Sequence, residues 1–357
     1  MIKIGDLKIT KEHKDVIKDI LESERITEGK YVALFEREVE KYLGVKHCIA
    51  VTNGTVALQL VSQLVGDDNG KLVVVPALTF PATANAFLLT GQEIALCDID
   101  ETLLIDITTL SEEQKHAIDI IVPVHLMGYM ADMEYIMEEA TKYNWIVIED
   151  TAEAFGAELN GKKAGTFGHF GTFSFFVSHN IWGGELGCIV TNDDEDAERL
   201  RSTKNHGRTG DPMKFLHKYV GSNYKTNEFC AGLAYVNLKH ADEIIAKRLS
   251  VSEEFELGIT NERLTPYAAE KGFSPLGYPI QADTEEYRDE ICKKLNDAGI
   301  ETRNIFPCLA NQECYDGLSS ESYPVANDIE KRVFYIGCHQ YMTKKDVKKV
   351  LKVINDE

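Results

Sequence analysis

Short apolar runs alternate with helix-like stretches through the first half of the chain, and this alternation constrains the fold more than any other feature. The runs are LVVVP at 72–76, EIALC at 93–97, IDIIVPV at 118–124, WIVIE at 145–149, GTFSFF at 171–176 and LGCIVT at 186–191. Stretches such as VALQLVSQLV and ADMEYIMEEATKY have the spacing of helices. Strands that alternate with helices form a mainly parallel sheet covered on both faces. We therefore expect an α/β fold.

The pattern changes in the last third of the chain. In the first half of the chain, a helix is predicted at 36–43 and ends at Gly44. In the last third, residues 228–262 are predicted to form one long helix. Beyond it we expect a helix at 286–298, a strand in ETRNIF and a final helix at 344–354. These elements predict a large domain over residues 1–245 and a smaller α+β C-terminal domain over residues 246–357.

Charge and composition exclude several classes of protein. The formal net charge of -20 argues against nucleic-acid binding, and an anionic substrate needs a local positive site. The chain has no apolar run of roughly 18 residues, and its N-terminus lacks the apolar core of a signal peptide. The eight cysteines form no CxxC or CxC pair, so no metal site is expected. We expect a cytoplasmic protein that has no contact with a membrane.

Three segments carry candidate functional residues. In AVTNGTVAL a strand leads into Gly54 and Thr55, where the amides of a helix N-terminus favour a phosphate. In IVIEDTAEAFG, Asp150 stands at the carboxyl end of a strand, where α/β sheets place ligand groups. In GTFSFFVSHNIWGGELG, a strand ends at Ser174 and His179 follows in a loop. Taken one at a time, two helix caps and a structural histidine explain these residues equally well.

In combination, the segments resemble the DegT/StrS family of sugar aminotransferases, which have the fold type I architecture of pyridoxal phosphate enzymes. The resemblance covers nearly the whole chain. It runs through ITEGKYVALFEREVEKYLGVKHCIAVTNGTVALQL, VPALTFPATANAFLLTG, PVHLMGYMADM, IEDTAEAFGAELNGKKAGTFGHFGTFSFF, NHGR and SNYKTNEFCAGLA. It implies an aminotransferase-like fold, pyridoxal or pyridoxamine 5′-phosphate as cofactor, and a nucleotide-linked keto sugar as substrate.

The resemblance also implies roles for single residues. Gly54 and Thr55, assisted by Ser174, match the residues that hold the cofactor phosphate. Phe80 matches the residue stacked on the pyridine ring, and Asp150 matches the partner of the ring nitrogen.

Three further matches concern the substrate and the partner subunit. Asn223 in SNYK matches an asparagine that reaches the phosphate from the neighbouring subunit, which implies a homodimer with shared active sites. Thr27 and Gly29 match a segment near the substrate.

His179 is the main departure from the family pattern, because it occupies the position of the lysine that holds the cofactor covalently. Imidazole has no primary amine for that bond, but it can move protons near neutral pH. The same change is found in the 3-dehydratases of 3,6-dideoxysugar pathways. By analogy, His179 removes a proton from the cofactor methylene while an NDP-4-keto-6-deoxyhexose loses its C3 hydroxyl. An amino donor such as glutamate then regenerates the cofactor.

Glu153 is a second departure, because the family often has glutamine or histidine beside the cofactor. A glutamate near the ring oxygen needs protonation or a cationic partner, unless it is a solvent-facing helix residue. Arg303 in ETRNIF can offer an anionic substrate a bidentate contact, although an ordinary surface arginine fits as well.

The sequence leaves two other functions open. A sugar aminotransferase remains if another residue replaces the lysine, or if His179 is an engineered substitution. A non-catalytic homologue also remains, although the retention of Gly54, Thr55, Asp150, Ser174 and Asn223 together argues against it.

Overall fold

The computed structural model describes residues 1–66, 70–210, 212–269, 272–315, 317 and 322–356. Its centre is a seven-stranded sheet. In spatial order the strands are β1 (His47–Val51), β9 (Gly187–Thr191), β8 (Phe170–Ser174), β5 (Ile146–Asp150), β4 (Ile120–Ile121), β2 (Leu72–Pro76) and β3 (Glu93–Cys97). The strands from β8 to β3 pair in parallel, whereas β9 is antiparallel to both of its neighbours. The expected mainly parallel sheet is confirmed.

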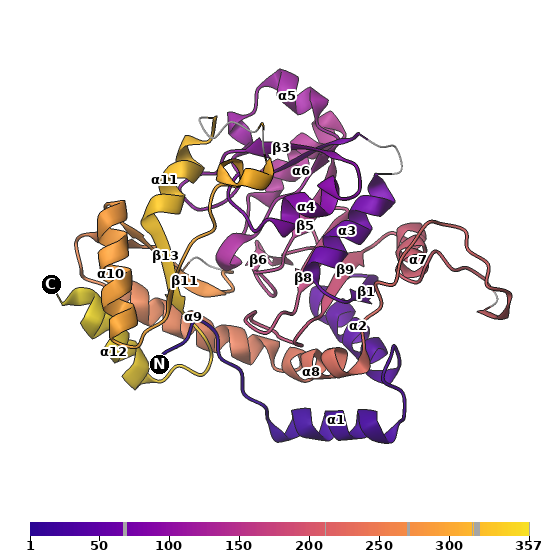
Figure 1. Cartoon of the computed structure of the whole chain (residues 1–357), viewed down its shortest axis with the longest axis horizontal. Coiled ribbons are helices and arrows are strands. Elements are labelled where there is room, and N and C mark those ends of the chain that lie inside the picture. The colour runs from indigo at the N-terminus through magenta and orange to yellow at the C-terminus, as the bar shows by residue number, and fades with distance from the viewer. Residues whose placement is uncertain (67–69, 211, 270–271, 316, 318–321, 357) are drawn as a thin grey trace.

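Helices cover both faces of this sheet (Figure 1). They are α2 (Lys30–Leu43), α3 (Gly54–Val65), α4 (Ala82–Leu88), α5 (Glu112–Ala117), α6 (Met133–Tyr143), α7 (Asp194–Thr203) and α8 (Glu228–Leu238). Helix α1 (Lys11–Glu22) packs against α8. Alternation along β1 divides the core: Ile49 and Val51 pack with α3, whereas Cys48 and Ala50 pack with α2 and α8. Strands buried on both faces explain the uninterrupted apolar runs in the sequence.

The last third of the chain forms a four-stranded antiparallel sheet in the order β10 (Leu264–Pro266), β11 (Gly277–Ala282), β13 (Val333–Gly337) and β12 (Thr302–Asn304). Its helices are α10 (Glu285–Asp297), α11 (Pro324–Arg332) and α12 (Lys344–Asn355). Helix α9 (Ala241–Gly258) contributes Ile244 to the core beside β1 and Phe255 to the core of this smaller sheet. The expected domain boundary at 245/246 falls inside α9.

Short hairpin and turn elements complete the description. They are β6 (Glu158–Leu159), β7 (Lys162–Lys163) and the 3-10 turns Ile107–Thr109, Leu126–Gly128, Pro212–Lys214, Leu309–Asn311 and Glu313–Tyr315. The described residues contain no helix long and apolar enough to cross a membrane.

Two expectations about single elements need correction. The continuous helix predicted over 228–262 is two helices, because it breaks at Lys239 and His240 before α9 begins. Neither residue is glycine or proline, so the sequence gives no breaker at this position. The strand predicted over 118–124 pairs regularly only at Ile120 and Ile121. Pro123 follows, and it has no N–H to donate to a ladder.

Candidate active site

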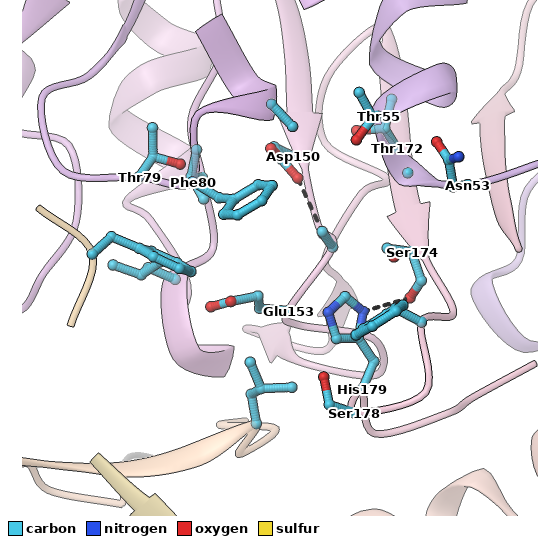
Figure 2. A pocket seen from close by; sticks show the side chains of 18 of the residues that line it. Asn53, Thr55, Thr79, Phe80, Asp150, Glu153, Thr172, Ser174, Ser178 and His179 are labelled. Carbon is cyan, nitrogen blue, oxygen red and sulfur yellow. Dashed lines mark hydrogen bonds between the residues drawn. The ribbon is translucent and has the colours of Figure 1, made fainter. Parts of the chain in front are cut away.

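A cavity of about 390 Å³ opens at the edge of the large sheet where β5 and β8 end (Figure 2). Open α/β sheets bind ligands at this edge, outside the carboxyl ends of parallel strands. The structure brings together here most of the residues singled out in the sequence: Gly54, Thr55, Phe80, Asp150, Glu153, Ser174, His179 and Arg303. The cavity therefore collects segments from both parts of the chain.

One end of the cavity is the N-terminus of α3. Asn53 caps the helix by accepting a hydrogen bond from the amide of Val56 at 2.9 Å. Ser174, at the end of β8, lies so close that a Cβ on Gly54 would be 2.8 Å from the Ser174 Cβ. Glycine is required by this close approach. Amides at a helix N-terminus and two hydroxyl side chains, Thr55 and Ser174, form a suitable site for a phosphate.

Asp150 lies at the end of β5 and is buried. Its Oδ2 accepts a hydrogen bond from the Thr83 hydroxyl at 2.8 Å, and its Oδ1 accepts one from the amide of Ala152 at 3.2 Å. Burial raises the pKa of Asp150, although these hydrogen bonds oppose the shift. A buried carboxylate of this kind favours a cationic ligand group, such as a protonated ring nitrogen.

A buried network supports the strand that carries Asp150. The preceding residue, Glu149, accepts hydrogen bonds from the amides of Gly165, Phe167 and Gly168 at 2.6–2.7 Å. It also accepts one from His125 Nε2 at 3.0 Å, because the amide of Ala131 donates to His125 Nδ1 and fixes that tautomer. The network leaves Glu149 fully paired and holds the end of β5 in place.

His179 faces the cavity with a defined ring orientation (Figure 2). Its Nδ1 lies 3.0 Å from the carbonyl oxygen of Ser174. A carbonyl can only accept, so Nδ1 carries the proton and Nε2 keeps a free lone pair. Burial lowers the pKa of His179 to about 4, and the positive charge of Arg248 acts in the same direction. His179 is therefore a neutral base at physiological pH.

The loop that carries His179 is tied to the smaller domain through the next residue. Asn180 donates from Nδ2 to both the carbonyl and the hydroxyl oxygen of Ser274, at 3.0 and 2.9 Å. The Ser274 hydroxyl donates in turn to the carbonyl oxygen of Phe155 at 2.7 Å. Buried Arg248 donates to the carbonyl oxygens of Pro275 and Leu276, the next two residues of the same segment.

Glu153 lies in the cavity wall, and its Oε2 accepts a hydrogen bond from the amide of Met127 at 2.9 Å. Burial raises the pKa of Glu153 to about 7, and the nearby charge of Asp150 contributes to the rise. The cavity therefore holds two groups with shifted pKa values: that of Glu153 is raised, so its carboxyl group is partly protonated at pH 7, and that of His179 is lowered, so its imidazole stays neutral well below pH 7.

The open side of the cavity is aromatic and basic. Phe80 is 56% exposed and lies 5.6 Å from Phe306, measured between ring centroids. Arg303 in β12 lines the cavity and donates to Glu301 at 3.1 Å. An exposed aromatic ring and a guanidinium at the opening suit a planar ring and an anionic substrate respectively.

Sequence reasoning missed several residues of the site. Tyr335 and Phe306 reach the cavity from the smaller domain, and Glu185 reaches it from the glycine-rich turn after His179. Thr83 donates its hydroxyl hydrogen bond to Asp150 and belongs to the LTFPAT segment. Its position three residues after Phe80 was the one signal in the sequence that it lies near the site.

Three predicted site residues lie outside this cavity. The amide of Gly29 donates to buried Glu228 at 2.9 Å at the start of α2, and Thr27 is an exposed neighbour. Asn223 is exposed and forms an isolated β-bridge with Asn205, the second residue after α7. Their expected contacts with substrate and cofactor remain predictions.

Comparison with known proteins assigns the family. The sequence model of the DegT/DnrJ/EryC1/StrS aminotransferase family matches residues 7–355. The chain belongs to this family of sugar aminotransferases, which are fold type I enzymes that depend on pyridoxal phosphate or pyridoxamine phosphate. The resemblance, the fold class and the cofactor expected from the sequence are confirmed.

Particular relatives are similar over their whole length. The GDP-perosamine synthase of Caulobacter vibrioides is 32% identical over 363 aligned positions, which cover 99% of this chain and 97% of the relative. That of Escherichia coli O157:H7 is 31% identical, with 98% and 96% covered. The structure of E. coli GDP-4-keto-6-deoxy-D-mannose-3-dehydratase with bound hydrated pyridoxal phosphate superposes with a TM-score of 0.89, 25% identity and 99% of each chain covered.

The residues of the cavity fit the cofactor of the family. The α3 N-terminus and the Ser174 hydroxyl suit its phosphate, and Phe80 suits its ring face. Asp150 is a buried carboxylate that forms no ion pair with any described residue, so a protonated ring nitrogen would supply the missing cation. None of the described residues that line the cavity is a lysine.

Proposed function

We propose that the chain is a nucleotide-sugar 3-dehydratase. It removes the C3 hydroxyl of an NDP-4-keto-6-deoxyhexose with pyridoxamine phosphate as cofactor, and His179 serves as the base in place of the family lysine. The observation that carries this proposal is the identity of the proton acceptor in the cavity. It is the His179 imidazole, which has a free Nε2, and no lysine among the described residues lines the cavity.

The bound cofactor supplies a primary amine for the sugar ketone and a pyridine ring that accepts electrons. Asp150 keeps the ring nitrogen protonated, since its buried carboxylate is stabilised by that positive charge. His179 Nε2 accepts a proton from the carbon next to the ring and delivers it to the departing hydroxyl. An imidazole that is neutral at pH 7 can accept this proton without first losing its own.

A histidine favours elimination because of what it cannot do. A lysine at position 179 would have an amine that can bond the cofactor covalently and so favour transamination. His179 has no such amine, so it would act on the bound sugar only as a base, and loss of the C3 oxygen would not compete with amine exchange at this residue. Loss of the C3 oxygen reduces the sugar by two electrons, so the overall reaction requires an electron source. An amino donor supplies these electrons when it is oxidised. Glutamate is the donor we propose; it is oxidised to 2-oxoglutarate, and its nitrogen leaves as ammonium.

The proposed working unit is a homodimer in which Asn223 completes the partner's site. Asn223 is exposed in the segment between α7 and α8, which also carries the exposed side chains Phe215 (69%) and Val220 (97%). Residues 204–225 include five lysine or arginine residues and one aspartate, in a chain of net charge -20. A basic, partly apolar segment on an acidic chain is suited to contact a second copy.

A sugar aminotransferase is the second candidate, and the GDP-perosamine synthases favour it by their identity of 31–32% over nearly the full length. The two functions differ in their nitrogen balance. Transamination retains the donor nitrogen in the sugar, whereas the dehydratase releases it.

The test is an incubation with pyridoxal phosphate, glutamate and a panel of NDP-4-keto-6-deoxyhexoses. The sugar product is followed by mass spectrometry, and ammonium and 2-oxoglutarate are assayed in parallel. The proposal predicts a product lighter by one oxygen and equal amounts of ammonium and 2-oxoglutarate. An amino sugar without ammonium would overturn it and leave the aminotransferase. Absence of any product or cofactor binding would indicate a non-catalytic homologue.

A further inference from the structure

The turn that contacts Glu153 is held rigidly at the cavity wall. Met127 has a φ of 56° and Gly128 a φ of 99°, so two consecutive residues adopt left-handed conformations. The amide of Ser274 donates to the Gly128 carbonyl at 3.1 Å, and that of Leu276 to the Met127 carbonyl at 3.1 Å. A Cβ on Gly128 would lie 2.0 Å from the Ser274 oxygen. These contacts direct the Met127 amide at Glu153 Oε2.

The hydrogen bond from Met127 satisfies only one oxygen of Glu153. No hydrogen bond joins Oε1 to any other part of the chain that the structure describes, and the carboxyl group points into the cavity (Figure 2). The ionisable side chains that line the same cavity are Asp150, His179, Glu185, Arg303 and Tyr335.

None of these groups neutralises Glu153. Arg303, the cation among the described residues that line the cavity, is paired with Glu301. His179 is neutral, and its Nδ1–H donates a hydrogen bond to the carbonyl oxygen of Ser174. Among the described residues, no ion pair includes Glu153, whereas Asp150 and Glu185 add like charge to the cavity. A negatively charged carboxylate in this position is destabilised, because no cation compensates it. A proton on Oε1 makes the group neutral and removes this energetic cost.

We propose that Glu153 works as a neutral carboxylic acid: Oε2 accepts from the Met127 amide, and the proton on Oε1 is donated to the oxygen on the cofactor ring. Glu153 is thus a cofactor-binding residue, and its protonation makes cofactor binding dependent on pH. The proposal rests on the proposed function for the presence of the cofactor and on the family resemblance for the ring oxygen beside Glu153, but not on the fate of the sugar. The pKa of Glu153, raised to about 7 by burial, agrees with it.

Glutamine, one of the two residues that the family often has at this position, provides the matched variant. Glu153→Gln keeps the size and a hydrogen-bond donor but cannot ionise. The measurement is the dissociation constant of pyridoxal phosphate and of pyridoxamine phosphate from the cofactor-free protein, followed by absorbance between pH 6 and 9 without sugar. For wild type we expect affinity to fall by up to about tenfold for each pH unit above 7, because only the protonated form binds well.

Glu153→Gln is expected to bind without this loss, so its affinity should exceed that of wild type by about 100-fold at pH 9. Ionisation of the cofactor itself affects both proteins equally, so it cancels in the ratio of their dissociation constants. Glu254→Gln, a change on the exposed face of α9, should follow wild type. The same pH dependence in Glu153→Gln and wild type would overturn the proposal. Weaker binding by Glu153→Gln at every pH would also overturn it, because the carboxylate would then be the active form.

Stability of the cofactor-free protein gives a second readout. The pKa of Glu153 is higher in the fold than the usual 4.5, so wild type should lose stability as pH rises from about 4.5 through 7. Glu153→Gln should not share this loss in urea unfolding. Neither readout involves the sugar, so an amino-sugar product would reject the dehydratase and leave this inference standing. Equal unfolding profiles for the two proteins would contradict it.

Discussion

The Nδ1–H of His179 donates to the carbonyl oxygen of Ser174 at 3.0 Å, so the end of strand β8 decides which ring nitrogen faces the cavity. The free Nε2 lone pair and the Ser174 hydroxyl that we propose binds the cofactor phosphate come from residues five positions apart. Base and phosphate site are therefore held by the same strand end. The base is a side chain of its own, however, so a mutation at position 179 can remove it and leave the Ser174 hydroxyl in place.

Replacement of His179 by glutamine should remove the base and retain the cofactor. The glutamine amide can donate a hydrogen bond, but it cannot accept the proton. We expect the turnover rate to fall by about 10²–10⁴-fold, the usual contribution of a general base, with cofactor affinity within a few-fold of wild type. Steady-state kinetics and cofactor titration measure the two quantities. His116→Gln on exposed α5 is the control. Loss of cofactor binding in parallel with activity would assign His179 a binding role instead.

The acidic limb of the pH profile should lie well below the ordinary histidine value. Burial lowers the pKa of His179 to about 4, so the imidazole stays neutral and active as a base above that pH. The profile of kcat/KM for the free enzyme should not decline between pH 8 and 5 on account of this group. The lowered pKa also means that protonation opposes folding, so stability should decrease as pH falls from about 6.5 through 4. A decline centred near pH 6.5 that disappears in His179→Gln would contradict the burial argument.

Asp150→Asn separates cofactor binding from folding. The variant loses a charge-assisted hydrogen bond to the ring nitrogen, worth about 1.5–3 kcal/mol, so cofactor affinity should fall by about 10–100-fold. The pKa of Asp150 is raised by burial, so its charge destabilises the cofactor-free fold at neutral pH. Asp150→Asn without cofactor should therefore unfold at the same or a higher urea concentration than wild type. A less stable cofactor-free variant would show that Thr83 and Ala152 require the carboxylate.

Asn180 should matter for the position of the base rather than for its chemistry. Asn180→Ala leaves the buried carbonyl and hydroxyl oxygens of Ser274 without their donor, which costs about 1–3 kcal/mol of unfolding free energy. The loop with His179 then loses its tie to the smaller domain, and turnover should fall while the pH profile keeps its shape. Urea unfolding and kinetics measure both effects. Unchanged stability together with unchanged turnover would rule out this role.

Shared active sites predict that two inactive variants restore each other. In a mixed dimer of His179→Ala and Asn223→Ala chains, one site retains both His179 and the partner's Asn223, and the other site has neither. Refolding the two variants together at equal amounts should recover up to about one quarter of wild-type activity, since half of the dimers are mixed. Either variant refolded alone is the control. No recovery in dimers confirmed as mixed would place Asn223 outside the site.

The sequence predicts much of the sheet and one side of the site. Apolar runs bounded by polar residues mark β2, β3, β5, β8 and β9 to within two residues, because strands buried on both faces need continuous apolar side chains. Asp150 and Ser174 follow from the rule that strand ends collect ligand groups. Gly54 follows from a strand that leads into a helix.

The remaining parts of the site depend on tertiary contacts that have no local pattern. Met127 adopts a left-handed backbone although it is not glycine, so nothing in the sequence indicates that its amide contacts Glu153. Tyr335 reaches the cavity only because the smaller sheet packs against the larger one. The ring orientation of His179 depends on a backbone carbonyl, which every residue possesses.

The central claim is that the residue at position 179 decides between dehydration and transamination, and His179→Lys tests it most directly. With the same NDP-4-keto-6-deoxyhexose, pyridoxal phosphate and glutamate, the sugar products of wild type and variant are compared by mass spectrometry. The account predicts a product lighter by one oxygen from wild type, and an amino sugar from the variant together with a borohydride-stable cofactor adduct on the chain. An amino sugar from both proteins, or a variant that binds the cofactor covalently and still yields only the deoxygenated product, would contradict it.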